Sequence, residues 1–186
     1  DAFGGFGALR GAIFDDDYGE MHFYQREAQR YFANILPSFS APVLKAIDKL
    51  SGVDVSVIAP SHGLVWRKEP ERIVNLYRTW AEYSTRPAEY GVTMIWGSMY
   101  GNTEAMMNAV AEGISRTGLP LAIYDAARTH VSYILPSLWS QRGVMIGAPT
   151  YETSLFPPVA NVLAMAQHKR VRNKQVAMFG SYGWSG

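Results

Sequence analysis

The chain has 186 residues, a formal net charge of +1 and no cysteine. These values exclude disulfides, thiolate zinc sites and cysteine-ligated iron–sulfur clusters, and they give no reason to expect a nucleic-acid or membrane surface. With 48% apolar and 18% charged residues, and no apolar run long enough to span a bilayer, we expect a globular, cytoplasmic protein with one large or two small domains.

The first part of the chain predicts helices. Apolar residues at helical spacing indicate a helix over 21–36, which Pro37 ends. Ser40 is the expected N-cap of a second helix that Gly52 closes. A third helix is expected over 70–83, again from its apolar spacing.

Two other segments of this part could matter for function. Residues 53–58 are rich in valine and predict a short strand, and the loop that follows contains His62. A histidine in a loop after a strand is a possible metal ligand, although most such histidines bind no metal. The run Asp15-Asp16-Asp17 also offers carboxylates, but we interpret it as a solvated acidic turn.

After residue 91, apolar runs alternate with helical patterns. Strands are expected over 92–96, 121–124, 144–147 and 175–179. Helices are expected over 103–117, 132–141 and 156–167, with Ser132 as a cap and Pro136 in the first turn of the second of these. This alternation predicts an α/β fold with a doubly wound parallel sheet.

The loop after the first of these strands is the strongest functional signal. It reads Gly97-Ser98-Met99-Tyr100-Gly101-Asn102-Thr103-Glu104 and leads into a helix. Free N–H groups, the helix dipole and neutral hydroxyl and amide donors suit a phosphate monoester. Because the loop has no lysine or arginine, it does not fit a nucleotide-triphosphate loop. The alternative is a tight turn at Gly101 with Thr103 as a helix cap.

Two further loops follow later strands, and the carboxyl ends of parallel strands meet at one edge of a sheet. Their residues are Ala148-Pro149-Thr150-Tyr151 and Gly180-Ser181-Tyr182-Gly183-Trp184-Ser185-Gly186. Tyr151, Tyr182 and Trp184 offer flat faces on which an aromatic ring system could stack.

The first loop resembles the phosphate loop of flavodoxins, and the other two are similar to loops of the flavodoxin-like domain of flavodiiron proteins. The resemblance implies that Ser98, Met99, Tyr100, Gly101, Asn102 and Thr103 hold the phosphate of FMN. It implies that the isoalloxazine is flanked by Pro149, Thr150, Tyr151, Ser181, Tyr182, Gly183 and Trp184. Tyr100 departs from the pattern, since many flavodoxins have threonine there.

The front of the chain also resembles this family, in which a metallo-β-lactamase-like domain precedes the flavodoxin-like one. Asp1-Ala2-Phe3-Gly4 and Ser61-His62-Gly63 look like two of its metal-binding segments. The resemblance implies that Asp1 bridges two irons and that His62 is a terminal ligand. The family's His-x-Glu-x-Asp-His motif is missing, and we expect it upstream. Tyr31 could approach the substrate pocket, but a core position is the simpler interpretation.

The implied domains are 1–85, the C-terminal portion of the di-iron domain; 86–90, a linker; and 91–186, an FMN-binding domain without its last strand. The implied activity is reduction of dioxygen to water or nitric oxide to nitrous oxide at a non-haem di-iron site. FMN relays electrons from a donor such as rubredoxin or reduced deazaflavin. The family forms head-to-tail homodimers or homotetramers.

Two alternatives remain open. One is a flavodoxin-like electron carrier without catalytic metal, and the other is a metallo-β-lactamase-type hydrolase joined to an inert α/β module. The Gly-Ser-Tyr-Gly-Trp segment argues against the hydrolase, in which it has no evident purpose. We expect residues 1–186 alone to be inactive and prone to aggregate, because both domains would lack elements that cover their apolar faces.

Overall fold

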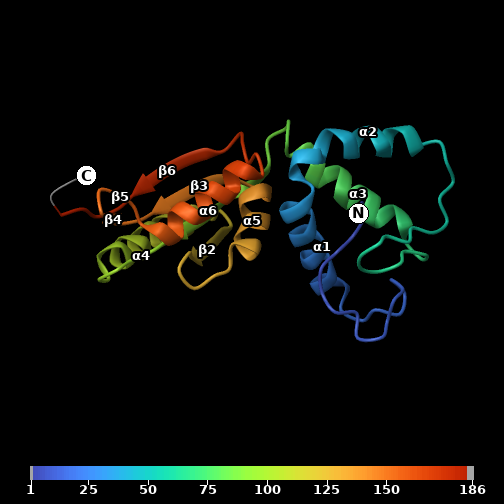
Figure 1. Cartoon of the computed structure of the whole chain (residues 1–186), viewed down its shortest axis with the longest axis horizontal. Coiled ribbons are helices and arrows are strands. Elements are labelled where there is room, and N and C mark those ends of the chain that lie inside the picture. The colour runs from blue at the N-terminus through green and yellow to red at the C-terminus, as the bar shows by residue number, and fades with distance from the viewer. Residues whose placement is uncertain (1, 184–186) are drawn as a thin grey trace. The chain divides into compact units, whose positions relative to one another are not determined.

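A computed structural model describes residues 2–183 of the chain. The chain divides into two compact units, Asp1–Arg86 and Pro87–Gly186, which we call the N-terminal and the C-terminal unit. Figure 1 shows helices and loops in the first unit and strands covered by helices in the second. Among the described residues, no helix combines the length and the apolar character needed to cross a bilayer.

The N-terminal unit contains the three predicted helices. They are α1 (Met21–Ile35), α2 (Ser40–Leu50) and α3 (Pro70–Glu82), with a short 3-10 helix, η1 (Pro37–Phe39), between the first two. α3 lies against both α1 and α2. Proline at the start of α3 needs no hydrogen-bond acceptor in the first turn, which explains where that helix begins.

The core of this unit is aromatic. The ring of Tyr77 lies 5.3 Å from that of Phe32 and 5.5 Å from that of Trp80, and the ring of Tyr24 lies 5.9 Å from that of Trp66. All five side chains are buried. Such tilted and edge-to-face contacts favour one arrangement of the helices over others.

Two predictions of secondary structure in this unit are wrong. Ser40 does not cap α2: η1 already turns the chain, so Ser40 is the first helical residue and its hydroxyl donates to the Pro37 carbonyl at 2.8 Å. The strand over 53–58 does not form. Among the described residues the only bridge there joins Ile58 to Trp66, and the run Val53–Val57 lies exposed because no neighbouring strand pairs with it.

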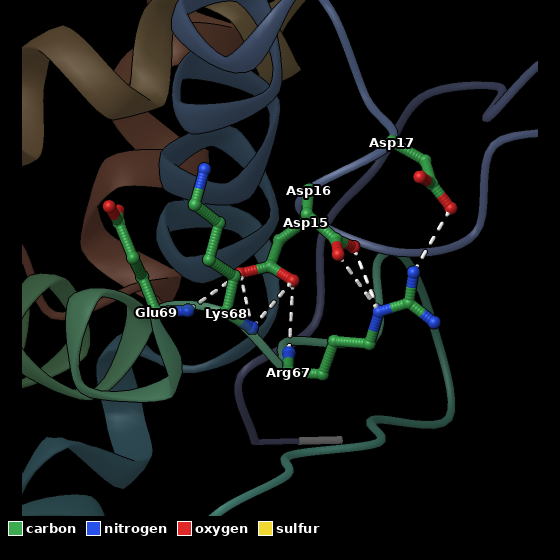
Figure 2. A network of polar contacts seen from close by, with 6 residues as sticks. All are labelled: Asp15, Asp16, Asp17, Arg67, Lys68 and Glu69. Atoms are coloured by element: carbon green, nitrogen blue, oxygen red, sulfur yellow. Dashed lines mark hydrogen bonds and ion pairs between the residues drawn. The ribbon is translucent and has the colours of Figure 1, made fainter.

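The interpretation of the acidic run as a solvated turn is wrong for Asp15, which is only 8% exposed. Its carboxylate accepts hydrogen bonds from the backbone N–H groups of Arg67, Lys68 and Glu69, the shortest at 2.9 Å. Figure 2 shows this carboxylate facing the backbone of Arg67, Lys68 and Glu69, while Asp16 and Asp17 face the Arg67 guanidinium. Burial alone would raise the pKa of Asp15, but these three backbone donors outweigh it and lower the pKa.

The C-terminal unit is built on a parallel sheet of four strands, in the order β2-β1-β3-β6. The strands are β1 (Glu89–Trp96), β2 (Leu121–Asp125), β3 (Gln141–Gly147) and β6 (Gln175–Phe179). The prediction of an α/β fold with a doubly wound parallel sheet is confirmed. Its central strands are apolar and buried, with Met94 and Ile95 of β1 fully covered.

Three helices cover the sheet: α4 (Asn102–Ser115), α5 (Val131–Ser140) and α6 (Pro157–His168). The chain moves from β1 to β2 through α4, then reverses direction through α5 and α6. Since crossovers of this kind are right-handed, α4 covers one face of the sheet and α5 and α6 cover the other. α5 and α6 contact each other, as this arrangement requires.

Three details of this unit differ from the predictions. His130, not Ser132, caps α5: its ring nitrogen accepts from the Ser132 N–H at 3.3 Å, so Pro136 lies inside the helix and not in its first turn. β1 begins at Glu89, within the predicted linker. The loop after β3 contains a small hairpin of β4 (Thr150–Tyr151) and β5 (Ser154–Leu155).

Candidate functional site

The loop between β1 and α4 has the geometry of an anion site. Gly101 adopts φ +89°, a left-handed conformation that glycine reaches without steric cost. Its N–H donates to the Ser98 hydroxyl at 3.0 Å, which closes the turn. No side chain caps α4, so the N–H groups of its first turn are available to a ligand at the positive end of the helix dipole.

The alternative in which Thr103 is merely a helix cap is not what the structure shows. Thr103 lies within the first turn of α4 and is only 1% exposed. Its hydroxyl lies 3.2 Å from that of Ser181, which follows β6. The two hydroxyls therefore join the first loop to the third.

The second loop is joined to the third through the backbone. The Ala148 N–H donates to the Phe179 carbonyl at 3.1 Å, and the Thr150 N–H donates to the Ser181 carbonyl at 2.9 Å. A Cβ at Gly180 would overlap the Ala148 carbonyl, so only glycine allows this close approach. The three loops thus form one connected edge of the sheet.

These loops surround a hollow of about 460 Å³. Its wall is formed by Ser98, Met99, Tyr100, Asn102, Thr103, Pro149, Thr150, Glu152, Thr153, Ser181, Tyr182 and Gly183. Of the residues predicted to bind FMN, Gly101 and Tyr151 are not in this wall; the Tyr151 ring lies 6.5 Å from that of Phe156. Trp184 is outside the described residues.

Sequence reasoning missed Glu152 and Thr153, which connect β4 to β5 and line the hollow. Their position directly after the predicted loop is the signal that could have found them. They adopt φ +48° and +62°, which residues other than glycine and asparagine rarely do.

The wall of the hollow fits FMN. Hydroxyl groups, an amide and the first turn of α4 provide neutral donors for a phosphate monoester. Tyr100 and Tyr182, which are 88% and 70% exposed, offer aromatic surface beside the hollow. The lining residues include no lysine or arginine, so the site suits a single phosphate and not a polyphosphate.

The predicted metal-binding segments of the N-terminal unit also meet. The Gly5 N–H donates to the His62 carbonyl at 3.2 Å, so Gly4 and Gly5 lie beside the Ser61-His62-Gly63 loop. The ring of Tyr31 lies 5.8 Å from that of His62. Tyr31 is 5% exposed, which agrees with its interpretation as a core aromatic, and burial raises its pKa.

These residues do not by themselves make a metal centre. Asp1 lies outside the described residues. Between residues 2 and 183, no three histidine, aspartate or glutamate side chains come together in a way that could hold a metal ion. The roles assigned to Asp1 and His62 remain predictions.

Residues 94–186, half of the chain, match the Flavodoxin family. The chain therefore belongs to the flavodoxin family.

The similarity to known proteins extends to both units, and the resemblance to flavodiiron proteins is confirmed. The chain is 36% identical over 178 residues to an anaerobic nitric oxide reductase flavorubredoxin of Aeromonas hydrophila, covering 94% of this chain and 35% of the relative. It superposes on the rubredoxin oxygen:oxidoreductase of Desulfovibrio gigas with a TM-score of 0.92 and 30% identity, covering all of this chain and 46% of the other. The flavodiiron protein of Giardia intestinalis gives a TM-score of 0.92 at 26% identity, with 100% and 45% covered. The chain thus spans about a third of the length of the curated relatives that it matches.

Proposed function

We propose that the protein is an oxidoreductase in which FMN relays electrons to a non-haem di-iron site that reduces nitric oxide to nitrous oxide, dioxygen to water, or both. The hollow at the edge of the sheet carries this proposal, because three loops surround it with neutral donors and aromatic side chains. The names of the relatives support the choice of substrates: one is a nitric oxide reductase and another an oxygen oxidoreductase.

The residues of the hollow have separate tasks in this proposal. Ser98, Asn102 and Thr103 hold the phosphate together with the N–H groups of α4. Tyr182 and the hairpin beyond Thr150 confine the ring system and keep water from one side of it. When bound, FMN supplies electron transfer in steps of one or two electrons, which no side chain of this hollow can provide.

The di-iron part of the proposal depends on Asp1 and His62, and on ligands beyond these two. The hydrogen bond between Gly5 and His62 supports it, because it holds the two segments together. Since the described residues alone do not fit a metal pair, we derive no reaction step through the irons.

The proposal also includes the partners. Rubredoxin, or a small reduced deazaflavin, supplies the electrons; the words flavorubredoxin and rubredoxin in the names of the relatives support this. A head-to-tail homodimer or homotetramer brings the FMN of one subunit close to the metals of another.

The test uses protein expressed from the complete gene. We expect flavin absorption bands, a pair of irons per chain, and consumption of nitric oxide or dioxygen under otherwise anaerobic conditions when an electron donor is added. A protein that contains flavin but no iron would contradict the proposal and would indicate an electron carrier. A protein that contains zinc, hydrolyses esters and binds no flavin would indicate the hydrolase.

A further inference from the structure

The hairpin beside the hollow has an unusual turn. Only two residues, Glu152 and Thr153, connect β4 to β5, and both have positive φ. A two-residue turn with this geometry normally contains asparagine and glycine, because longer side chains are strained there. The chain therefore keeps a glutamate at a position that favours smaller residues.

The hairpin holds Glu152 at a defined place on the wall. Thr150 pairs with Leu155 and Tyr151 with Ser154, so the turn between them cannot shift in register. The Thr150 N–H also donates to the Ser181 carbonyl at 2.9 Å, which fixes the hairpin to the loop after β6. Within the turn, the Thr153 hydroxyl donates to the Glu152 carbonyl at 2.6 Å.

Among residues 2–183, Glu152 is also the only charged residue that lines the hollow. Across residues 2–183, no ion pair joins its carboxylate to a lysine or arginine. The wall therefore carries one uncompensated negative charge. Water screens this charge in part, since Glu152 is exposed, and a ligand that fills the hollow would displace some of that water.

We propose that Glu152 sets the reduction potential of the bound flavin, an inference that depends on FMN binding as proposed above. Full reduction of the ring at neutral pH takes two electrons from an external reductant and one proton from water, and leaves one negative charge on the ring. The carboxylate opposes that charge, so it lowers the potential of the last electron and makes the reduced cofactor a stronger donor. It acts through its charge and takes no part in proton transfer.

The experiment compares three variants of the protein from the complete gene with the wild type. Glu152→Gln removes the charge with little change in shape, and Glu152→Asp keeps it. Glu112→Gln makes the same change of net charge on the exposed part of α4, away from the hollow. The potential of the bound FMN is measured by anaerobic titration with dithionite in the presence of reference dyes, and the Kd of oxidised FMN is measured with the apoprotein.

We expect Glu152→Gln to favour the last reduction step by up to about tenfold, which equals about 59 mV for one electron. The Kd of oxidised FMN should change much less, and the shift should shrink as ionic strength rises. The potential of the bound FMN in Glu152→Asp and in Glu112→Gln should stay close to that of the wild type. Equal potentials for Glu152→Gln and the wild type would overturn the inference, as would equal shifts for Glu152→Gln and Glu152→Asp. Wild-type protein that binds no FMN would overturn the proposed function as well, before any variant is compared.

Discussion

The two units hold their candidate sites in different ways. In the C-terminal unit, backbone hydrogen bonds between neighbouring strand ends join the loops, as between Thr150 and Ser181. In the N-terminal unit, tyrosine hydroxyls from helices hold the segments: Tyr77 donates to the Gly4 carbonyl at 2.8 Å, and Tyr24 accepts from the Leu64 N–H at 2.9 Å. Burial raises the pKa of Tyr24 and Tyr77, so both hydroxyls stay protonated at neutral pH.

This difference indicates where the two sites are sensitive to mutation. A sheet edge held by backbone groups keeps its shape when one side chain changes, because the ladder of hydrogen bonds remains. A loop that depends in part on a buried hydroxyl loses that hydrogen bond, and leaves a backbone group unsatisfied, when the contact is disturbed. We therefore expect single substitutions to have larger effects in the N-terminal unit.

The largest effect should come from Gly63→Ala in the N-terminal unit. Gly63 adopts φ +95°, and a Cβ there would overlap the Tyr24 hydroxyl and lie 2.9 Å from the Gly5 nitrogen. The left-handed backbone costs about 1–2 kcal/mol and the overpacking about 1–3 kcal/mol, so we expect a loss of about 2–5 kcal/mol. Thermal unfolding followed by tryptophan fluorescence measures it.

Gly52→Ala is the matched control, since nothing lies within 4 Å of a Cβ at Gly52 and its φ is not positive. It should change the free energy of unfolding by less than about 0.5 kcal/mol. If both variants melted at the same temperature, the contact between Gly63 and Tyr24 would not support the unit, and the comparison drawn above would fail.

A second large effect is expected from Asp15→Asn. The amide keeps one acceptor oxygen but loses the charge that satisfies three backbone N–H groups. We expect a loss of about 1–3 kcal/mol. Asp17→Asn is the control, because that carboxylate is exposed and pairs with Arg67 at 3.3 Å, an arrangement worth at most about 1 kcal/mol. Chemical denaturation of both variants at neutral pH would show the difference.

The effect of Asp15 also depends on pH. Its folded-state pKa is lowered from 3.8, so its contribution to stability is present above that pH and disappears as pH falls through 3.8 towards the folded-state pKa. The difference in the free energy of unfolding between the wild type and Asp15→Asn should therefore become smaller in acid. A gap that stayed constant from neutral pH to below the folded-state pKa would contradict the role of the charge.

Local patterns were enough to predict most of the fold. The helices and strands of both units follow from apolar spacing and from runs of buried residues, and the three loops follow from the rule for parallel sheets. The predictions that were wrong depend on contacts with residues elsewhere in the chain. Residues 53–57 have the composition of a strand but pair with no strand among residues 2–183, and Asp15 is buried against the distant segment Arg67–Glu69.

In the candidate site, too, local sequence predicted some features, and others depend on contacts between distant residues. Thr103 was predicted as a phosphate ligand from its place in the loop, whereas its contact with Ser181 joins residues far apart in sequence. Glu152 and Thr153 were missed because the sequence lacks the Asn-Gly pair that normally marks a two-residue hairpin. The hairpin became visible only through the pairing of Thr150 with Leu155.

A smaller effect is expected from Thr103→Val in the C-terminal unit. The variant keeps the shape of the side chain but loses a hydroxyl near the phosphate and its contact with Ser181. Since one hydrogen bond to a charged group contributes about 1.5 kcal/mol, FMN should bind roughly tenfold more weakly. The fold should persist, because the backbone ladder is untouched.

Fluorescence titration of apoprotein with FMN measures this change in affinity. Thr79→Val is the control; that hydroxyl donates to the Asn75 carbonyl of its own helix in the other unit. An unchanged Kd for Thr103→Val would remove Thr103 from the site. A global loss of structure would show that the edge of the sheet depends on this side chain, contrary to the comparison.

The smallest effect is expected from Lys174→Met, which tests whether the C-terminal unit has a side-chain support of its own. The Lys174 ammonium donates to the Trp139 and Gln141 carbonyls, each at 2.7 Å, at the end of α5. At neutral pH the loss should be only about 1 kcal/mol, because the cost of burying the charge offsets much of the benefit of the two hydrogen bonds.

Because burial penalises the charged form of Lys174, the stability difference between the wild type and Lys174→Met should change with pH in a predictable direction. Burial lowers the pKa of Lys174 from 10.5 to about 8 in the folded state. Between these values the unfolded chain binds more protons than the folded one, so the wild type should gain stability relative to Lys174→Met as pH rises from about 8 to 10.5. Denaturation at several pH values in this window tests the sign. A stability difference that fell with rising pH would show that the Trp139 and Gln141 carbonyls hold the charged form in place, and that this unit too relies on a single side chain.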